Sequence, residues 1–200
     1  GQATLGQAIG WRRESRAMSK TRVVVASLAL SAAGFVGWIA REGDSSVVEQ
    51  DGVELLAPHI PTKGDVPTIG HGSTRYEDGT RVTLADPPIT RERAQQLARA
   101  LHSEEEQRFQ SSLPGAKLFQ EEYDLYLDFV GQYGIGNWSR SAMRRHLLAG
   151  EYPKACDALL KWRYAAKYDC STLVNGKPNQ RCWGVWTRQL ERHAKCWSVQ

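Results

Sequence analysis

The sequence predicts an α+β fold, mainly helical, in which a small β-hairpin lobe joins a larger helical lobe. Residues from about 41 to 79 are rich in glycine, proline and β-branched residues. From residue 90 onward, apolar residues recur instead at the spacing of helices. The 200 residues, 41% of them hydrophobic and 24% charged, suit one compact domain with a short appendage and exclude a disordered chain. A cleft between the two lobes is the natural place for a functional site.

The β-rich part contains two short strand-like runs, at about 53–60 and 66–70. They are separated by Pro61-Thr62-Lys63-Gly64-Asp65, whose residues favour turns. We therefore expect a hairpin that turns at Lys63-Gly64.

The helical part begins at Thr90, a favourable N-cap for a helix from Arg91 towards Phe109. Leu113-Pro114-Gly115 ends that helix. The next helix carries a buried stripe at i, i+3 and i+4 spacing. Its members are Tyr123, Tyr126, Leu127, Val130 and Tyr133. Further helices are expected at about 141–149, 153–164 and 184–197.

An uncharged segment, VVVASLALSAAGFVGWIA at residues 23–40, is long enough to span a membrane as a helix. Basic residues precede it, which predicts the N-terminus inside and the rest of the chain outside. Half of the segment is alanine, serine or glycine, so it can enter a bilayer without being held there firmly. Three interpretations follow: a signal peptide cleaved near Ser31-Ala32-Ala33, a permanent anchor, or a releasable anchor. We favour the releasable anchor.

These features divide the chain into three parts. Met18 resembles a natural start, so residues 1–17 are interpreted as an N-terminal extension, native or added by cloning. Residues 18–40 form the membrane-insertion segment and residues 41–200 the globular domain. We expect a monomer.

The four cysteines all lie in the last quarter of the chain, and none forms a C-x-x-C pair, which argues against a zinc site. With an export-like segment upstream, two disulfides in an oxidising compartment are favoured over four reduced thiols. Cys170 and Cys182 flank a polar, turn-rich stretch and are expected to pair, which leaves Cys156 to pair with Cys196.

The net charge of +4 suits a polyanionic partner such as nucleic acid, anionic lipid or the bacterial wall. The basic residues are scattered and no nucleic-acid recognition motif is present, so a nucleic-acid partner is disfavoured. Neither a metal nor a cofactor is expected.

Two motifs flank the expected hairpin: Arg41-Glu42-Gly43 before it and Thr68-Ile69-Gly70-His71-Gly72 at its end. Hydrolysis of a glycosidic bond needs a carboxylic acid that protonates the leaving oxygen and a second group that activates water or stabilises the cation. A glutamate facing a glycine-rich hairpin, whose backbone can approach a sugar closely, fits that requirement.

These motifs resemble those of the phage-type lysozymes of glycoside hydrolase family 24. Further blocks extend the resemblance over about residues 41–197. They are Tyr133-Gly134-Ile135-Gly136, Leu147-Leu148-Ala149-Gly150-Glu151-Tyr152, Trp162-Arg163-Tyr164-Ala165, and residues 184–192. The resemblance implies a lysozyme-like fold and hydrolysis of the β-1,4 bond between N-acetylmuramic acid and N-acetylglucosamine in peptidoglycan.

The resemblance also implies roles for individual residues. Glu42 would be the general acid, and Thr68 would hold the catalytic water. Gly70, His71 and Gly72 would line the substrate site, with His71 not acting as a base.

The chain departs from the family at the position of the second carboxylate. The family's aspartate usually stands six residues before the threonine, where this chain has Thr62. Asp65 is the nearest carboxylate on the hairpin and our first candidate, and Glu54 is the second.

Only Arg41 separates the uncharged segment from Glu42, so insertion of the segment would pin the acid at the membrane surface. The chain thus resembles the signal-anchor-release endolysins of the family. That resemblance implies an enzyme inactive at the host inner membrane, which becomes active in the periplasm and lyses the host. The alternatives are a chitinase-like glycan hydrolase and a non-catalytic wall-binding protein on a membrane tether.

Overall fold

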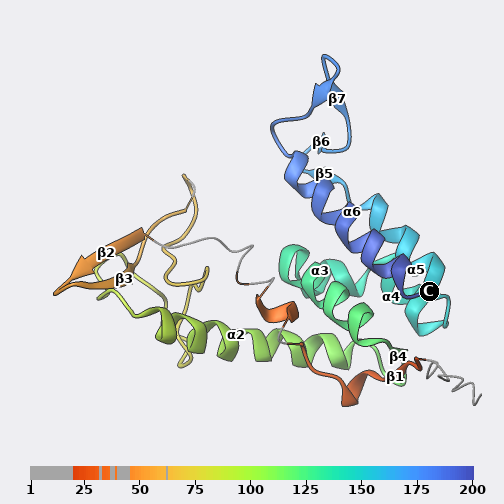
Figure 1. The fold of residues 1–200 in the computed structure, drawn as a ribbon, viewed down its shortest axis with the longest axis horizontal. Coiled ribbons are helices and arrows are strands. Elements are labelled where there is room, and N and C mark those ends of the chain that lie inside the picture. Colours follow the sequence, from red (N-terminus) through yellow and green to blue (C-terminus); the bar gives the residue numbers. More distant parts are fainter. Residues whose placement is uncertain (1–19, 32, 37–38, 40–45, 62) are drawn as a thin grey trace, which may run out of the picture.

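The computed structural model describes residues 20–31, 33–36, 39, 46–61 and 63–200. Glu42 and Thr62 lie outside the described residues. A small β-rich lobe and a larger helical lobe are connected by one long helix, α2 (Arg91–Ser111) (Figure 1). This arrangement confirms the expected mainly helical α+β fold.

The β-rich lobe is built on a hairpin of β2 (Ser46–Gln50) and β3 (Val53–Ala57). Asp51 and Gly52 form its turn with positive φ angles of 51° and 76°. Asp-Gly is a preferred pair for such a two-residue turn, because both positions need a left-handed backbone. The expected pairing of residues 53–60 with 66–70 is largely wrong, since only a bridge between His59 and Thr68 joins the two runs.

Helix α2 begins where the sequence predicts, with the Thr90 side chain accepting a hydrogen bond of 3.1 Å from the backbone N–H of Arg93. Helix α3 (Gln120–Ser139) packs beside it and carries the expected apolar stripe. Tyr123 and Tyr126 of this stripe are fully buried in the main core. The N-cap and the stripe therefore define the two helices at the centre of the molecule.

The other helices are α4 (Ala142–Leu148), α5 (Tyr152–Ala158) and α6 (Trp183–Ser198). The helix expected at 153–164 ends earlier, because a 3-10 turn, η2 (Leu159–Lys161), closes α5. Between η2 and α6 run four two-residue strands that form two hairpins. They are β5 (Tyr164–Ala165), β6 (Tyr168–Asp169), β7 (Leu173–Val174) and β8 (Lys177–Pro178).

Both disulfides pair as the sequence favours. Cys156 of α5 is bonded to Cys196 of α6, inside the core. Cys170 is bonded to Cys182, across the loop that carries β7 and β8.

The N-terminal segment does not form the single helix expected over residues 23–40. β1 (Val23–Val24) pairs with β4 (Lys117–Leu118), and a 3-10 turn, η1 (Val25–Ser27), follows it. Val25 is buried in the main core, and residues 33–36 are helical. Val25 and its neighbours thus pack against the globular domain and do not form one regular helix. No helix among the described residues combines the length and apolar character that a membrane span requires.

Candidate functional site

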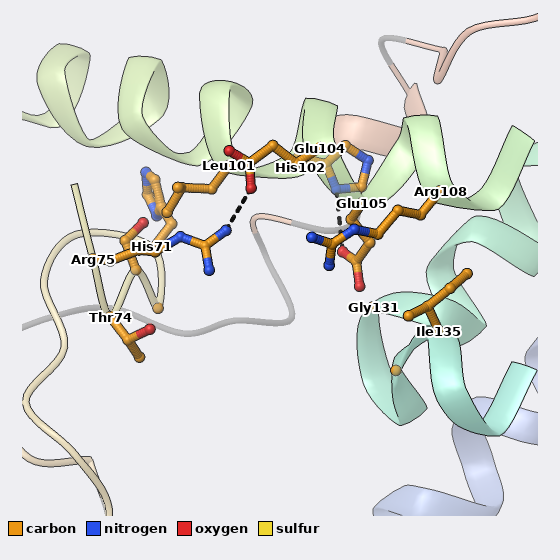
Figure 2. Close-up of a pocket in the computed structure, with 13 residues that line it drawn as sticks. His71, Thr74, Arg75, Leu101, His102, Glu104, Glu105, Arg108, Gly131 and Ile135 are labelled. Atoms are coloured by element: carbon orange, nitrogen blue, oxygen red, sulfur yellow. Dashed lines mark hydrogen bonds and ion pairs between the residues drawn. The ribbon is translucent and has the colours of Figure 1, made fainter. Parts of the chain in front are cut away.

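A pocket of about 420 Å³ lies between the two lobes. The β-rich lobe contributes residues 71–75, α2 contributes one charged face, and α3 contributes Gly131, Gly134 and Ile135 (Figure 2). Gly134 interrupts α3 with φ 85° and ψ 158°, a conformation that favours glycine. We call this pocket the interlobe cleft.

The edge of the cleft on the β-rich lobe is fixed by close packing on α2. Ile69 is fully buried and exchanges two backbone hydrogen bonds with Ser73, of 2.9 and 3.1 Å. Gly70 has a φ of 63°, and a Cβ placed there would lie 2.8 Å from the Cβ of Ala94. Glycine at this position therefore lets the turn seat against α2, so that His71 and Gly72 line the cleft.

Charged side chains from both lobes meet in the cleft. Arg75 Nη2 lies 2.6 Å from Glu104 Oε2, an ion pair between the β-rich lobe and α2 (Figure 2). Glu105 and Arg108 follow along the same face of α2. The cleft therefore presents hydrogen-bond donors and acceptors on its walls, as recognition of a polar polymer requires.

His102 of α2 is buried and lines the cleft. Burial lowers its pKa, and this effect outweighs the opposing influence of Glu106 and Asp128. Glu105 Oε2 lies 3.9 Å from His102 Nδ1, too far for a strong hydrogen bond. The imidazole is therefore neutral at neutral pH.

Of the residues expected to act in catalysis, Glu42 lies outside the described residues. Thr68 is buried, precedes the cleft-lining residues and is not one of them. Both its backbone N–H and its hydroxyl donate to the carbonyl oxygen of His59, at 2.8 and 3.3 Å. Asp65 is exposed and does not line the cleft. Glu54 is also exposed and lies 3.6 Å from Arg91 at the start of α2.

Of the residues expected to bind substrate, His71 and Gly72 line the cleft, whereas Gly70 packs on α2 behind it. The helices also contribute residues to the cleft, and these were not expected from the sequence. Glu104, Glu105 and Arg108 share one face of α2, and this charged face on a helix between two lobes is the signal that could have identified them.

Known proteins share both the sequence pattern and the fold. The phage lysozyme family matches residues 49–180. The endolysin of Salmonella phage P22 is 30% identical over 129 residues, which cover 64% of this chain and 86% of that protein.

Solved structures agree in fold. The endolysin from Escherichia coli O157:H7 phage FAHEc1 has a TM-score of 0.64 and 21% identity, over 85% of this chain and 94% of that one. A mutant of P22 lysozyme has a TM-score of 0.63 and 24% identity, over 85% and 99%. Since the family match covers more than half of the chain and includes the cleft edge at residues 71–75, the chain belongs to the phage lysozyme family and is a lysozyme that hydrolyses peptidoglycan.

Proposed function

We propose that this lysozyme cuts the β-1,4 bond between N-acetylmuramic acid and N-acetylglucosamine, with Glu42 as the proton donor. The observation that carries the proposal is the position of the motif at residues 68–72, which leads directly into the wall of the interlobe cleft. A sugar polymer in the cleft would lie against the charged face of α2.

In this reaction the carboxylic acid protonates the leaving oxygen while water attacks the sugar from the opposite face. The Thr68 hydroxyl donates to the carbonyl oxygen of His59, so its oxygen keeps lone pairs that can accept a hydrogen bond from that water. Neither Asp65 nor Glu54 lines the cleft, and Glu54 lies 3.6 Å from Arg91. Asp65 is closer to Thr68 in the sequence, so we keep it as the first candidate for the second carboxylate.

The test is hydrolysis of purified peptidoglycan by Glu42→Gln, Asp65→Asn and Glu54→Gln, compared with the unaltered protein. General acid catalysis contributes roughly 100-fold to 10,000-fold, so Glu42→Gln should lose at least about two orders of magnitude of rate while folding normally. Asp65→Asn should lose activity and Glu54→Gln should keep it. Near-normal hydrolysis by Glu42→Gln would refute the assignment of the acid.

The same assay separates the two alternatives. A chitinase-like enzyme would release reducing sugars from chitin but not from peptidoglycan. A non-catalytic wall-binding protein would bind peptidoglycan and release none.

The second part of our proposal is that the enzyme stays inactive at the host inner membrane, N-terminus inside, until residues 23–40 leave the bilayer. Release into the periplasm would then allow wall hydrolysis and host lysis. Support comes from the polar contacts that this segment and Arg22, the residue before it, make in the folded domain. The Arg22 guanidinium pairs with the buried carboxylate of Glu122 at 2.9 Å, and Gln110 Nε2 donates to the backbone oxygen of Leu28 at 2.9 Å. These contacts require the segment to be out of the membrane.

The folded domain also accommodates the segment's small residues. A Cβ at Gly34 would lie 2.8 Å from Leu30 Cδ1 and 3.0 Å from Asp124 Cγ, so a large residue there would disturb packing as well as membrane affinity. Ala26, Ala29 and Ala33 are exposed and can be enlarged without such a clash. Substitutions at these three positions therefore test membrane retention without also disturbing the packing of the folded domain.

To test this, the triple variant Ala26→Leu/Ala29→Leu/Ala33→Leu is expressed in the host. A variant with serine at the same three positions is the matched control. Leucine is more favourable in a bilayer, so the leucine variant should stay in the membrane fraction and fail to lyse cells. The serine variant should be released at least as readily as the unaltered protein. Prompt lysis by the leucine variant, with the protein in the soluble fraction, would refute the release proposal.

A further inference from the structure

Residues 163–182 form a projection that we call the stapled arm. It holds β5 to β8, is closed by the Cys170–Cys182 disulfide, and extends beyond α6 away from the helical lobe (Figure 1). Cys170 is the only buried residue of the arm, all of which the structure describes. The arm thus has no core of its own and is held in shape mainly by covalent and polar links.

The tip of the arm exposes aliphatic side chains. Leu173 is 62% exposed and Val174 is 53% exposed, and they precede a turn at Asn175-Gly176 with positive φ angles of 53° and 74°. Asn-Gly is a preferred pair for a tight hairpin turn, which gives the tip a defined shape. Adjacent exposed apolar residues on a shaped projection indicate an interaction surface.

The arm as a whole is positively charged. The arm has four basic residues and one acidic residue, a net charge of +3. The acidic residue, Asp169, is already engaged by Arg163 at 3.1 Å and by the Ser171 hydroxyl at 2.6 Å. Lys167 and Lys177 are exposed and make no ion pair within the described part of the chain. A negatively charged partner would therefore be attracted to the arm.

The tyrosines of the arm help to choose between a glycan and a lipid surface. A sugar-binding platform needs an open aromatic face, but the Arg181 guanidinium lies 4.0 Å from the ring centroid of Tyr168 and covers one face. Tyr164 is 52% exposed, with Arg163 at 5.5 Å from its ring centroid. Aliphatic residues at a tip, with tyrosines and basic residues behind them, match the order of groups at a membrane interface.

We propose that the stapled arm docks on an anionic lipid surface, with Leu173 and Val174 entering the hydrocarbon boundary and Lys167 and Lys177 facing the headgroups. This role is separate from wall hydrolysis and from the N-terminal segment. It would hold the folded enzyme at a membrane next to the wall.

The first test measures binding of the full chain to vesicles of phosphatidylethanolamine and phosphatidylglycerol. Leu173→Asp/Val174→Asp is compared with Val53→Asp/Leu84→Asp, two similarly exposed aliphatic residues outside the arm. Both variants add two negative charges and keep the N-terminal segment, so only the location differs. Because each buried methylene contributes to membrane binding, the arm variant should bind roughly tenfold more weakly than the control variant. Equal binding by the two variants would overturn the proposal.

The second test reports on the tip alone. Val174→Trp adds an indole, and its emission, obtained by subtracting the spectrum of the unaltered protein, should be quenched by lipids brominated on the acyl chains. Hydrolysis of peptidoglycan should be unchanged in both arm variants. An unquenched indole would overturn the proposal. The proposal would also be overturned if an arm variant lost its binding to purified wall sacculi but kept its binding to vesicles. That result would identify the wall as the partner.

Discussion

Glu106 on α2 accepts a hydrogen bond of 2.8 Å from the backbone N–H of Leu30, more than seventy residues earlier in the chain. The same carboxylate oxygen accepts the Tyr123 hydroxyl at 2.6 Å. One acidic side chain thus connects the N-terminal segment to both central helices. Burial and this hydrogen bond raise the pKa of Tyr123 well above its ordinary value, so the phenol remains a donor throughout the accessible pH range.

We expect Glu106→Ala to weaken the attachment of the N-terminal segment. The substitution removes the acceptor of two partly buried donors, and an unsatisfied buried donor costs about 1–3 kcal/mol. The free energy of unfolding should fall by about that amount, and proteolysis within residues 20–31 should become faster. Chemical denaturation and timed digestion measure the two effects.

Gln107→Ala is the matched control, because the neighbouring Gln107 is exposed. Surface substitutions of this kind change stability by only about 0.5 kcal/mol or less. If both variants behaved alike, the hydrogen bonds to Glu106 would not be what holds the segment in place.

Gly70→Ala should damage the wall of the cleft. The new Cβ would meet the Cβ of Ala94 at 2.8 Å, and the residue would keep a φ of 63° that disfavours alanine. Backbone strain and overpacking each cost about 1–3 kcal/mol, so we expect a loss of roughly 2–6 kcal/mol together with reduced peptidoglycan hydrolysis. Thermal unfolding and the hydrolysis rate are the measurements.

Gly79→Ala separates the effect of backbone strain from the effect of overpacking. Gly79 has a φ of 86° but no atom within 4 Å of the position of a Cβ, so only the backbone strain applies there. A loss of stability as large as that of Gly70→Ala would contradict the role that we give to the contact with Ala94.

The sequence predicted those parts of the fold that depend on local signals. The N-cap at Thr90 and the stripe that includes Tyr123 and Tyr126 identified α2 and α3, because capping and helical periodicity are properties of neighbouring residues. The hairpin was placed wrongly, although Asp51-Gly52 carried the signal for its turn.

Other features depend on contacts between distant residues, which no local pattern encodes. Residues 23–40 are apolar enough to suggest a membrane helix, yet Val25 is buried in the same core cluster as residues of α2 and α3. The cleft was also only partly predicted. His71 and Gly72 lie in a motif, whereas Arg108 enters the cleft because of how α2 is placed between the lobes.

The two disulfides should differ in what their removal affects. Cys156–Cys196 spans 40 residues and lies in the core, so Cys156→Ala/Cys196→Ala should lower the free energy of unfolding by about 3–5 kcal/mol. Cys170–Cys182 spans 12 residues within the exposed stapled arm, so its loss should mainly open the arm. Cys170→Ala/Cys182→Ala should unfold near the normal temperature but be cleaved faster within residues 163–182. The opposite ranking in calorimetry would contradict this division.

His102 should make the stability of the protein depend on pH. Burial lowers its pKa in the folded state below the ordinary value of 6.5, whereas the unfolded chain keeps the ordinary value. As the pH falls through 6.5, the unfolded state binds the proton first, so the free energy of unfolding decreases from that pH downward, by up to about 1.4 kcal/mol per pH unit. His102→Gln should flatten the dependence measured by denaturation between pH 7 and pH 5. His193→Gln is the control, because His193 lies 3.0 Å from Asp157 near the surface and is not buried. A slope that is unchanged in His102→Gln would mean that this buried imidazole does not govern the response to acid.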